Sequence, residues 1–473
     1  MILAAFRVRS FRFQWPADLL ASWAFEMETL ILGWYVLVQT GSVLALTVFG
    51  SLQFLGTLAA PMFGVLGDRV GARLMLCAMR AIYIVLAAAV MLLAFTGLLA
   101  PAWVIVLAGL NGLVRPNDLV MRNTLIGETI PPDHLMGALG MSRATMDSAR
   151  VGGALAGAGL STMLGIGTTY VFVTSFYLAS LALTFGVARA RPVPDPSAPS
   201  PYPTATPSPY PLPLAGEREK PSPSPPRKSE KPSPSRPGER EKPSPSPLRG
   251  EGRVRGGSQR GSSRWRELKD GLAHILTRPQ LLAPMWLAFL INLTAYPVTG
   301  GLLPYVARQV YQVDATGLGS LVAAFSFGAL LASIAMVMTG GPRHPERFTL
   351  IHTAIWYALL IGFGHVQSMS VGLLVLFAAG FVQSVAMIAM TATLLTAAGE
   401  GFRARVMGVR MLAVYGLPLG LMASGALIER IGYPVTITVL AAVGLLFTVL
   451  IGLKWRAAMW QRPAGTASAP QRA

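Results

Sequence analysis

Several carboxyl groups lie inside long apolar stretches of the sequence, where an ionisable side chain is costly and therefore points to a function. The first stretch contains Glu26 and Glu28. A helical spacing of about 100° per residue gives Glu26 polar neighbours on its own face, namely Asp18, Ser22 and Thr29. Glu28 lies about 200° round the helix, so we favour Glu26 as a carboxyl group that binds and releases a proton. An ion pair with an arginine of a neighbouring helix is the structural alternative for either residue.

Two further apolar stretches each carry a polar stripe at helical spacing. The stripes consist of Asn111, Arg115, Asp118 and Arg122 in one stretch and Arg143, Asp147 and Arg150 in the next. We expect Asp118, Arg122 and Arg143 to pair across helices in a structural or gating role. Asn111, Arg115 and Arg150 are candidates for the lining of a cavity that binds a small molecule, with helix packing as the alternative for Arg115 and Arg150. Asp147 joins Glu26 and Glu28 as a candidate for proton binding, with helix packing as the alternative.

The second half of the sequence offers neutral groups in place of carboxylates. No Asp or Glu lies well inside its apolar stretches. Asn292 and Tyr296 flank a helix break that Pro297 predicts, and Gln383 lies in a later stretch. We expect these three side chains to line the same cavity, although each alone is more often a packing contact. Any carboxyl group that carries a proton must then come from the first half.

The sequence lacks the patterns of the common catalytic and metal sites. It contains no nucleotide-binding G-x-x-x-x-G-K-[ST] loop, no zinc-binding H-E-x-x-H and no nucleophile elbow G-x-S-x-G. The single cysteine, Cys77, excludes an intrachain disulfide. We therefore predict no enzyme activity, no catalytic residue, no bound metal and no cofactor. No ring of charges typical of a channel filter is visible either.

The elements that carry these residues are predicted to be membrane-spanning helices. Of the 473 residues, 53% are hydrophobic and 13% are charged, about half the charged fraction of a soluble domain. The apolar residues fall in blocks of about twenty, the length of a helix that crosses a bilayer. We predict an all-α polytopic membrane protein with twelve transmembrane helices in two six-helix pseudo-repeats. The expected spans are 14–38, 44–66, 74–97, 102–122, 136–163, 168–189, 279–307, 315–339, 347–365, 371–396, 403–428 and 433–453.

Basic residues set the expected orientation of these helices. Arg and Lys gather in alternate loops and at both termini, whereas the other loops lack them except for Arg308 and Arg430. Because positive charge stays on the cytoplasmic side, we predict that both termini are cytoplasmic. The net charge of +18 then reflects cytoplasmic loops, and we expect no nucleic-acid partner.

A compositional change divides the chain. Residues 191–264 are rich in Pro, Ser and Arg, and the sequence EREKPSPSP occurs there twice, at 217–225 and 239–247. Such a segment cannot form a packed core, so we predict a disordered cytoplasmic linker. It separates an N-terminal half, residues 1–190, from a C-terminal half, residues 265–457. Residues 458–473 are predicted to be a disordered tail.

The loop between the second and third expected spans carries a recognisable motif. It reads GVLGDRVGAR from Gly64 to Arg73, which resembles the G-x-x-x-D-R-x-G-R-R loop of the major facilitator superfamily. The resemblance implies a gating role for Gly64, Asp68, Arg69, Gly71 and Arg73. In that family the Asp touches the start of span eleven, here near 402–403. Ala72 stands where the family has its first Arg after the Gly, which removes one basic contact.

Longer segments resemble one branch of that superfamily, the macrolide-efflux and enterobactin-exporter-like transporters. They include FRFQWPADLLASWAFEMETLILGWYV, SLQFLGTLAAPMFGVLGDRVGARL and FRARVMGVRMLAVYGLPLG. The resemblance implies a monomeric antiporter of the bacterial inner membrane that exports a small amphipathic molecule, as in drug resistance. Its expected partners are a drug- or siderophore-like substrate, protons and membrane lipid. The pair Gly152-Gly153 stands where such antiporters often carry Gly-Pro.

Other functions remain open at this stage. An importer or an uncoupled facilitator would use the same fold. A membrane scaffold or sensor with a degenerate site would need no substrate at all. Binding of a ligand with pH-dependent affinity separates these alternatives, because only a proton-coupled transporter links ligand affinity to pH.

Overall fold

The computed structural model describes residues 6–57, 70–130, 132–187, 275–339, 341–342, 344–398 and 403–460. This part of the chain is built from helices and contains no strand. The helices before residue 190 and those after residue 261 belong to one unit. The motif residues Gly64, Asp68 and Arg69 and the predicted linker lie outside the described residues, and so does the predicted tail after Trp460. The first three residues of that predicted tail, 458–460, are helical instead.

The N-terminal half follows the predicted spans closely. Its helices are α1 (Arg9–Thr40), α2 (Val43–Leu52), α4 (Ala72–Phe95), α5 (Pro101–Thr129) and α6 (Pro132–Phe185). Gly41 ends α1 in a left-handed conformation with φ 66°, and the Ser42 hydroxyl then accepts from the Ala45 N–H to cap α2. Gly165, with φ 78°, interrupts α6 between its two predicted spans. A residue with a Cβ would be strained at that φ.

The C-terminal half repeats this pattern with shorter pieces. Its helices are α8 (Pro279–Thr294), α9 (Tyr296–Gly300), α10 (Leu303–Tyr305), a π-helical turn (Val306–Val310), α11 (Ala315–Thr339), α12 (Pro345–His365), α13 (Met369–Ala398), α14 (Arg403–Leu412), a 3₁₀ turn (Ala413–Tyr415), α15 (Gly416–Ile431), α16 (Tyr433–Lys454) and α17 (Arg456–Trp460). The predicted break at Pro297 is confirmed, because α8 ends at Thr294 and a new helix begins at Tyr296.

The predicted membrane spans fall on these helical segments wherever the structure describes them, apart from short breaks. Eight helices in the described part are long and apolar enough to cross a bilayer, and one of them contains the bend at Gly165. Helices α2 and α8 are apolar but shorter. Helix α1 is not among these eight, because the carboxyl groups of Asp18, Glu26 and Glu28 lower its hydropathy. The layout is consistent with twelve spans in two six-helix repeats.

One arginine contact occurs in both halves. Arg73, near the start of α4, donates to the carbonyl oxygens of Thr184 and Phe185 at the end of α6, at 3.4 and 2.5 Å. Arg347, near the start of α12, donates to the carbonyl oxygen of Trp460 in α17. In each half, an arginine at the start of the third span therefore binds carbonyl oxygens at or just after the end of the sixth span. The Arg73 contact lies within the first half, whereas the motif predicted a gating role for this residue.

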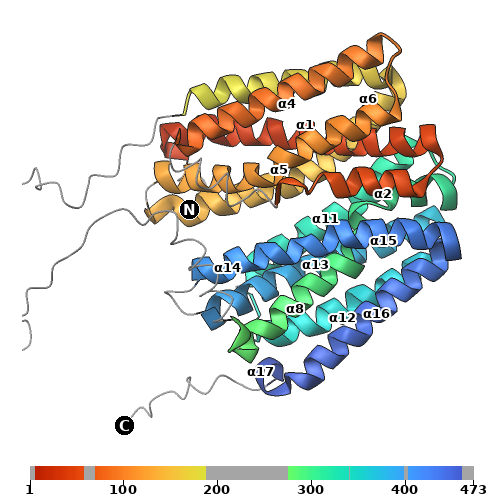
Figure 1. The fold of residues 1–473 in the computed structure, drawn as a ribbon. Helices are drawn as coiled ribbons and strands as arrows, with labels where there is room; N and C mark the ends of the chain where they lie inside the picture. The colour runs from red at the N-terminus through yellow and green to blue at the C-terminus, as the bar shows by residue number, and fades with distance from the viewer. Residues whose placement is uncertain are drawn as a thin grey trace, which may run out of the picture. The chain divides into compact units, whose positions relative to one another are not determined.

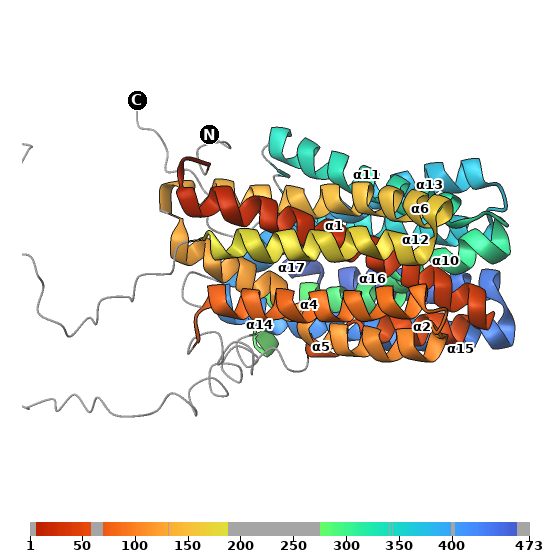
Figure 2. The ribbon, with the colours of Figure 1, turned by 90° about the horizontal axis from the view of Figure 1, so that it is seen from above.

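The two halves pack together through two helix pairs, α2 with α15 and α6 with α11 (Figures 1 and 2). Small residues bring these helices close. A Cβ atom added at Gly319 of α11 would lie 3.1 Å from the carbonyl oxygen of Ala154 in α6. Gly425 of α15 packs against the side chain of Thr47 in α2. Close crossings at small residues are typical of helices that associate in a membrane.

Hydrogen bonds join the halves at the end of the bundle where α1 ends and α2 begins. Arg308 Nη1 donates to the Leu37 carbonyl oxygen at 2.9 Å, and Ser42 Oγ donates to Glu429 Oε1 at 3.2 Å. We call these four residues the latch. Two further hydrogen bonds join the halves, from Ser51 Oγ to the Pro418 carbonyl oxygen at 3.1 Å and from Thr316 Oγ1 to Thr162 Oγ1 at 3.4 Å. The position of Arg308 at the sparsely charged end thus has a structural reason, since it caps the carbonyl end of α1.

Candidate functional site

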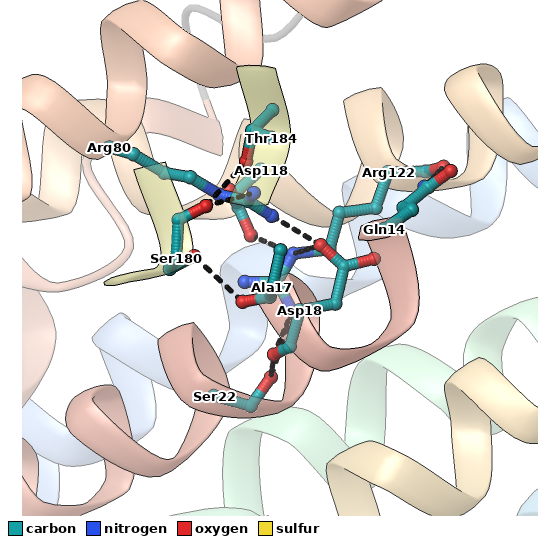
Figure 3. Close-up of polar contacts among 9 residues, drawn as sticks. All are labelled: Gln14, Ala17, Asp18, Ser22, Arg80, Asp118, Arg122, Ser180 and Thr184. Atoms are coloured by element: carbon teal, nitrogen blue, oxygen red, sulfur yellow. Dashed lines mark hydrogen bonds and ion pairs between the residues drawn. The ribbon is translucent and has the colours of Figure 1, made fainter. Parts of the chain in front are cut away.

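A buried cluster of charges ties together three helices of the first half (Figure 3). Asp18 of α1 forms an ion pair with Arg80 of α4, and its Oδ1 lies 3.6 Å from Arg122 Nε of α5. Arg122 also pairs with Asp118, one turn before it in α5. All four side chains are less than a tenth exposed. Two carboxylates and two guanidinium groups balance one another, which is the arrangement that makes buried charges tolerable.

Neutral groups complete this cluster and link it to α6. Arg80 Nη1 donates to the Ser180 carbonyl oxygen at 3.2 Å, and Ser180 Oγ donates to the Ala17 carbonyl oxygen at 2.7 Å. Arg122 Nη1 donates to Ser22 Oγ at 2.8 Å. The cluster therefore fixes α1, α4, α5 and α6 as one body. Arg122 pairs across helices with Asp18, as expected, whereas Asp118 pairs with Arg122 within α5. The role of Arg80, the partner of Asp18, was not predicted, although it is an arginine inside an apolar span.

A second site surrounds Glu28, which is 6% exposed. Its Oε2 accepts from Asn111 Nδ2 of α5 at 3.2 Å and from the Tyr177 hydroxyl of α6 at 3.0 Å. No Arg, Lys or His side chain among the described residues lies within ion-pair distance of this carboxyl group. We call Glu28, Asn111 and Tyr177 the Glu28 site. Tyr177 is not among the site residues predicted from the sequence.

Arg115 lies beside the Glu28 site without pairing with it. Its guanidinium group covers the ring of Phe25, and its Nη1 donates to Thr29 Oγ1 at 3.3 Å and to Gln53 Oε1. Pro116 follows it within α5. Glu28 and Arg115 line a cavity of about 10 Å³, roughly the space of one water molecule.

The more exposed charges lie where α1 crosses α6. Glu26 Oε1 is 3.6 Å from Arg150 Nε, and the two side chains are 21% and 44% exposed. A Cβ atom at Gly153, one turn after Arg150, would lie 2.9 Å from Glu26 Cβ, so this glycine allows α1 and α6 to cross closely. Asp147 and Tyr296 both contribute to the electrostatic environment of Arg150.

The second half presents an aromatic and amide pair to this region. Gln383 Nε2 of α13 donates to the Tyr296 hydroxyl of α9 at 2.6 Å. The Tyr296 ring packs edge-on against Trp356, with 5.3 Å between ring centroids. Asn292 Nδ2 donates to the Ala288 carbonyl oxygen of its own helix at 2.9 Å. We call Glu26, Asp147, Arg150, Tyr296 and Gln383 the central cluster.

The predicted site residues thus separate into groups. Glu26, Asp147, Arg150, Tyr296 and Gln383 lie in the central cluster, and Glu28 and Asn111 lie in the Glu28 site with Arg115 beside them. Asn292 precedes the helix break, and its side-chain hydrogen bond stays within its own helix. Gly71 precedes α4 with φ 90°, and Arg73 binds the end of α6. Within the described residues, no group of three or more His, Cys, Asp or Glu side chains is arranged to hold a metal ion.

Solved structures of several transporters have a similar fold. The chain aligns with a POT family transporter in complex with 5-aminolevulinic acid at a TM-score of 0.63 and 11% identity, covering 95% of this chain and 97% of that one. It aligns with the nucleoside transporter NupG at 0.61 and 11%, covering 96% and 100%. It aligns with the human organic anion transporter MFSD10 at 0.57 and 14%, covering 94% and 99%. At these identities the likeness concerns the fold.

Sequence comparison gives the family. No curated protein sequence matches the chain. The sequence model of the Major Facilitator Superfamily matches residues 15–418, which is most of the chain and extends from α1 to the start of α15. The protein is therefore a multi-pass membrane transporter and not an enzyme, and it belongs to the major facilitator superfamily.

Proposed function

We propose that the protein exports a small amphipathic molecule, drug-like or siderophore-like, by proton-coupled alternating access. It would act as a monomer in the bacterial cytoplasmic membrane, with both termini in the cytoplasm. The observation that carries this proposal is the central cluster. It combines a partly exposed ion pair from the first half, Glu26 with Arg150, and a tyrosine and an amide from the second half.

The chemistry of the central cluster suits an amphipathic substrate. Arg150 and Glu26 are loosely paired, at 3.6 Å, so a charged group of a substrate can replace one partner. Tyr296 and Trp356 offer aromatic surface for an apolar body. Gln383 can turn its amide from Tyr296 to the substrate. Binding sites for small molecules usually combine apolar walls with a few such polar groups.

The contacts support Glu28, and no longer Glu26, as the residue that couples transport to protons. A proton on Glu26 would break its ion pair with Arg150. Glu28 has only neutral hydrogen-bond partners among the described residues, so it can gain or lose a proton without breaking an ion pair. Glu26 also contributes to the electrostatic environment of Arg115, beside Glu28. Substrate charge at Glu26 can thereby influence protonation at Glu28.

A ligand screen tests the proposed function. Purified protein is tested for thermal stabilisation by macrolides, siderophores and lipophilic cations at two pH values. We expect at least one class to stabilise the protein, with an affinity that depends on pH. A ligand whose affinity is the same at both pH values would support an uncoupled facilitator, and uptake driven by an inward proton gradient in vesicles of known orientation would support an importer.

Removal of the ion pair should weaken substrate binding. We expect Glu26→Gln and Arg150→Gln each to raise the Kd of the identified ligand about tenfold, equivalent to about 1.4 kcal/mol. The double variant should lose little more, because the two residues act as one unit. Isothermal titration measures these affinities, and Arg430→Gln, at the latch end of α15, is the matched control. Wild-type affinity in Arg150→Gln would contradict the assignment of the central cluster.

The latch gives a direct test of alternating access. Ser42 Oγ and Glu429 Oε1 are 3.2 Å apart. Cysteine is shorter than glutamate and a direct disulfide needs Cβ atoms about 4 Å apart, so Ser42→Cys and Glu429→Cys, in a Cys77→Ala background, should be joined by a short reducible cross-linker that reacts with both thiols. A protein held closed at this end cannot complete a transport cycle. We expect substrate transport in proteoliposomes to fall to the level of protein-free vesicles and to return on reduction. The cross-linker should leave either single variant active, and full transport by the cross-linked protein would exclude opening at the latch.

A further inference from the structure

An apolar groove lies on the outside of the second half, between α12 and α16. It has a volume of about 440 Å³, within the range of sites that bind small molecules. Its walls include Ile351 of α12 and Val449 and Leu453 of α16. These side chains are 43%, 47% and 66% exposed, so no described helix covers them. In a chain that spans a membrane, such a surface faces lipid.

Basic and aromatic groups close one end of this groove. Arg456 and Trp460 of α17 both line it, and both are exposed. Arg347 of α12 donates to the Trp460 carbonyl oxygen and so holds α17 across the end of the groove. Lys454 lies over the ring of Trp455, with 4.9 Å from Nζ to the ring centroid.

At this end of the groove, positively charged side chains outnumber carboxylates. The neighbouring carboxylate of α12, Glu346, lies 3.6 Å from His344 Nδ1. Arg456 has no hydrogen bond or ion pair with another described residue. An exposed guanidinium group is therefore available at the point where the apolar surface ends.

We propose that this groove binds an anionic phospholipid. One acyl chain lies along Val449 and Leu453, and the phosphate receives hydrogen bonds from the Arg456 guanidinium. Arginine forms paired hydrogen bonds with phosphate oxygens. Tryptophan prefers the headgroup level of a membrane, where Trp460 would lie. Clusters of Arg and Lys beside the ends of membrane helices attract anionic lipids.

The proposal concerns a site separate from the central cluster. The groove opens outward from α12 and α16, whereas Glu26 and Arg150 lie where α1 crosses α6. A bound lipid would bridge α12, α16 and α17 and stabilise this end of the second half. The inference does not depend on which substrate the protein carries or in which direction.

Native mass spectrometry of the full chain tests this site. The protein is mixed with phosphatidylglycerol or phosphatidylcholine of the same acyl chains. The number of lipid molecules that stay bound is then counted as the collision energy is raised. We expect tighter retention of phosphatidylglycerol and a higher Tm in its presence. Arg456→Gln should weaken retention of phosphatidylglycerol about tenfold, since one charge-assisted contact is lost. Equal retention of the two lipids by the wild-type protein would overturn the proposal.

Two further variants distinguish the contribution of the lipid headgroup from that of the apolar groove. A Cβ atom at Gly452 would lie 3.3 Å from Leu350 Cδ1 and 3.9 Å from Trp460 Nε1, so Gly452→Leu fills the groove and should reduce retention of both lipids. Arg9→Gln removes an exposed arginine at the same end of the bundle but in the first half, and it should have no effect. The proposal fails if Arg9→Gln and Arg456→Gln behave alike. It also fails if a chain that ends at Trp460 binds more lipid, because residues 461–473 would then be the occupant.

Discussion

Glu28→Gln is expected to abolish transport driven by a proton gradient while substrate exchange continues. Glutamine has the shape of glutamate, and its amide oxygen can still accept from Asn111 and Tyr177. The protein should therefore fold, but the side chain can no longer carry a proton. In proteoliposomes we expect gradient-driven accumulation to fall to background, whereas counterflow of substrate persists. A pH-sensitive dye inside the vesicles should show no proton movement when substrate is added.

Glu26→Gln is the matched control for this experiment. It removes the other carboxyl group of the same helix, which pairs with Arg150 at 3.6 Å. We expect weaker substrate binding but continued proton movement at saturating substrate. The reverse result, with coupling lost in Glu26→Gln and kept in Glu28→Gln, would restore Glu26 as the coupling residue and exclude the role proposed for Glu28.

Arg80→Met is expected to cause the largest loss of stability. Arg80 is fully buried and pairs with Asp18, so its removal leaves a carboxylate short of its partner in the interior. Breaking a buried pair in this way costs about 3–5 kcal/mol. We expect a sharp fall in the yield of folded protein and in Tm, as measured by size-exclusion chromatography and scanning fluorimetry in detergent.

A second substitution should reverse much of this loss. Asp18→Asn combined with Arg80→Met removes both charges, and replacement of a whole buried pair is often neutral. Arg73→Met is the control, because Arg73 is only partly buried and its hydrogen bonds reach carbonyl oxygens at the end of α6. The account of the charged cluster is wrong if the double variant is no more stable than Arg80→Met.

The spans and their breaks could be predicted because they depend on local composition. Blocks of about twenty apolar residues must form helices in lipid, where no water satisfies the backbone. Pro297 lacks an N–H group, so a helix break beside it was expected and is present.

The partners of the buried charges could not be predicted because helical periodicity says nothing about which helix lies opposite. The polar stripe of α1 favoured Glu26, since its companions on the same helix are polar. The partners that distinguish Glu28 come from α5 and α6, more than eighty residues away in sequence. The ion pair of Arg80 could not be predicted for the same reason, because its partner Asp18 is 62 residues away. The roles of Gly64, Asp68 and Arg69 stay predictions.

The central claim is alternating access, in which the central cluster can be reached first from one side of the membrane and then from the other. The direct measurement is labelling of Tyr296→Cys, in a Cys77→Ala background, by a membrane-impermeant maleimide applied to either side of sealed vesicles. The account predicts labelling from the side where α1 begins, and labelling from the latch side when substrate and a pH gradient are supplied. Cross-linking of Ser42→Cys to Glu429→Cys should abolish only the latch-side labelling. Labelling from one side alone under every condition would contradict the account.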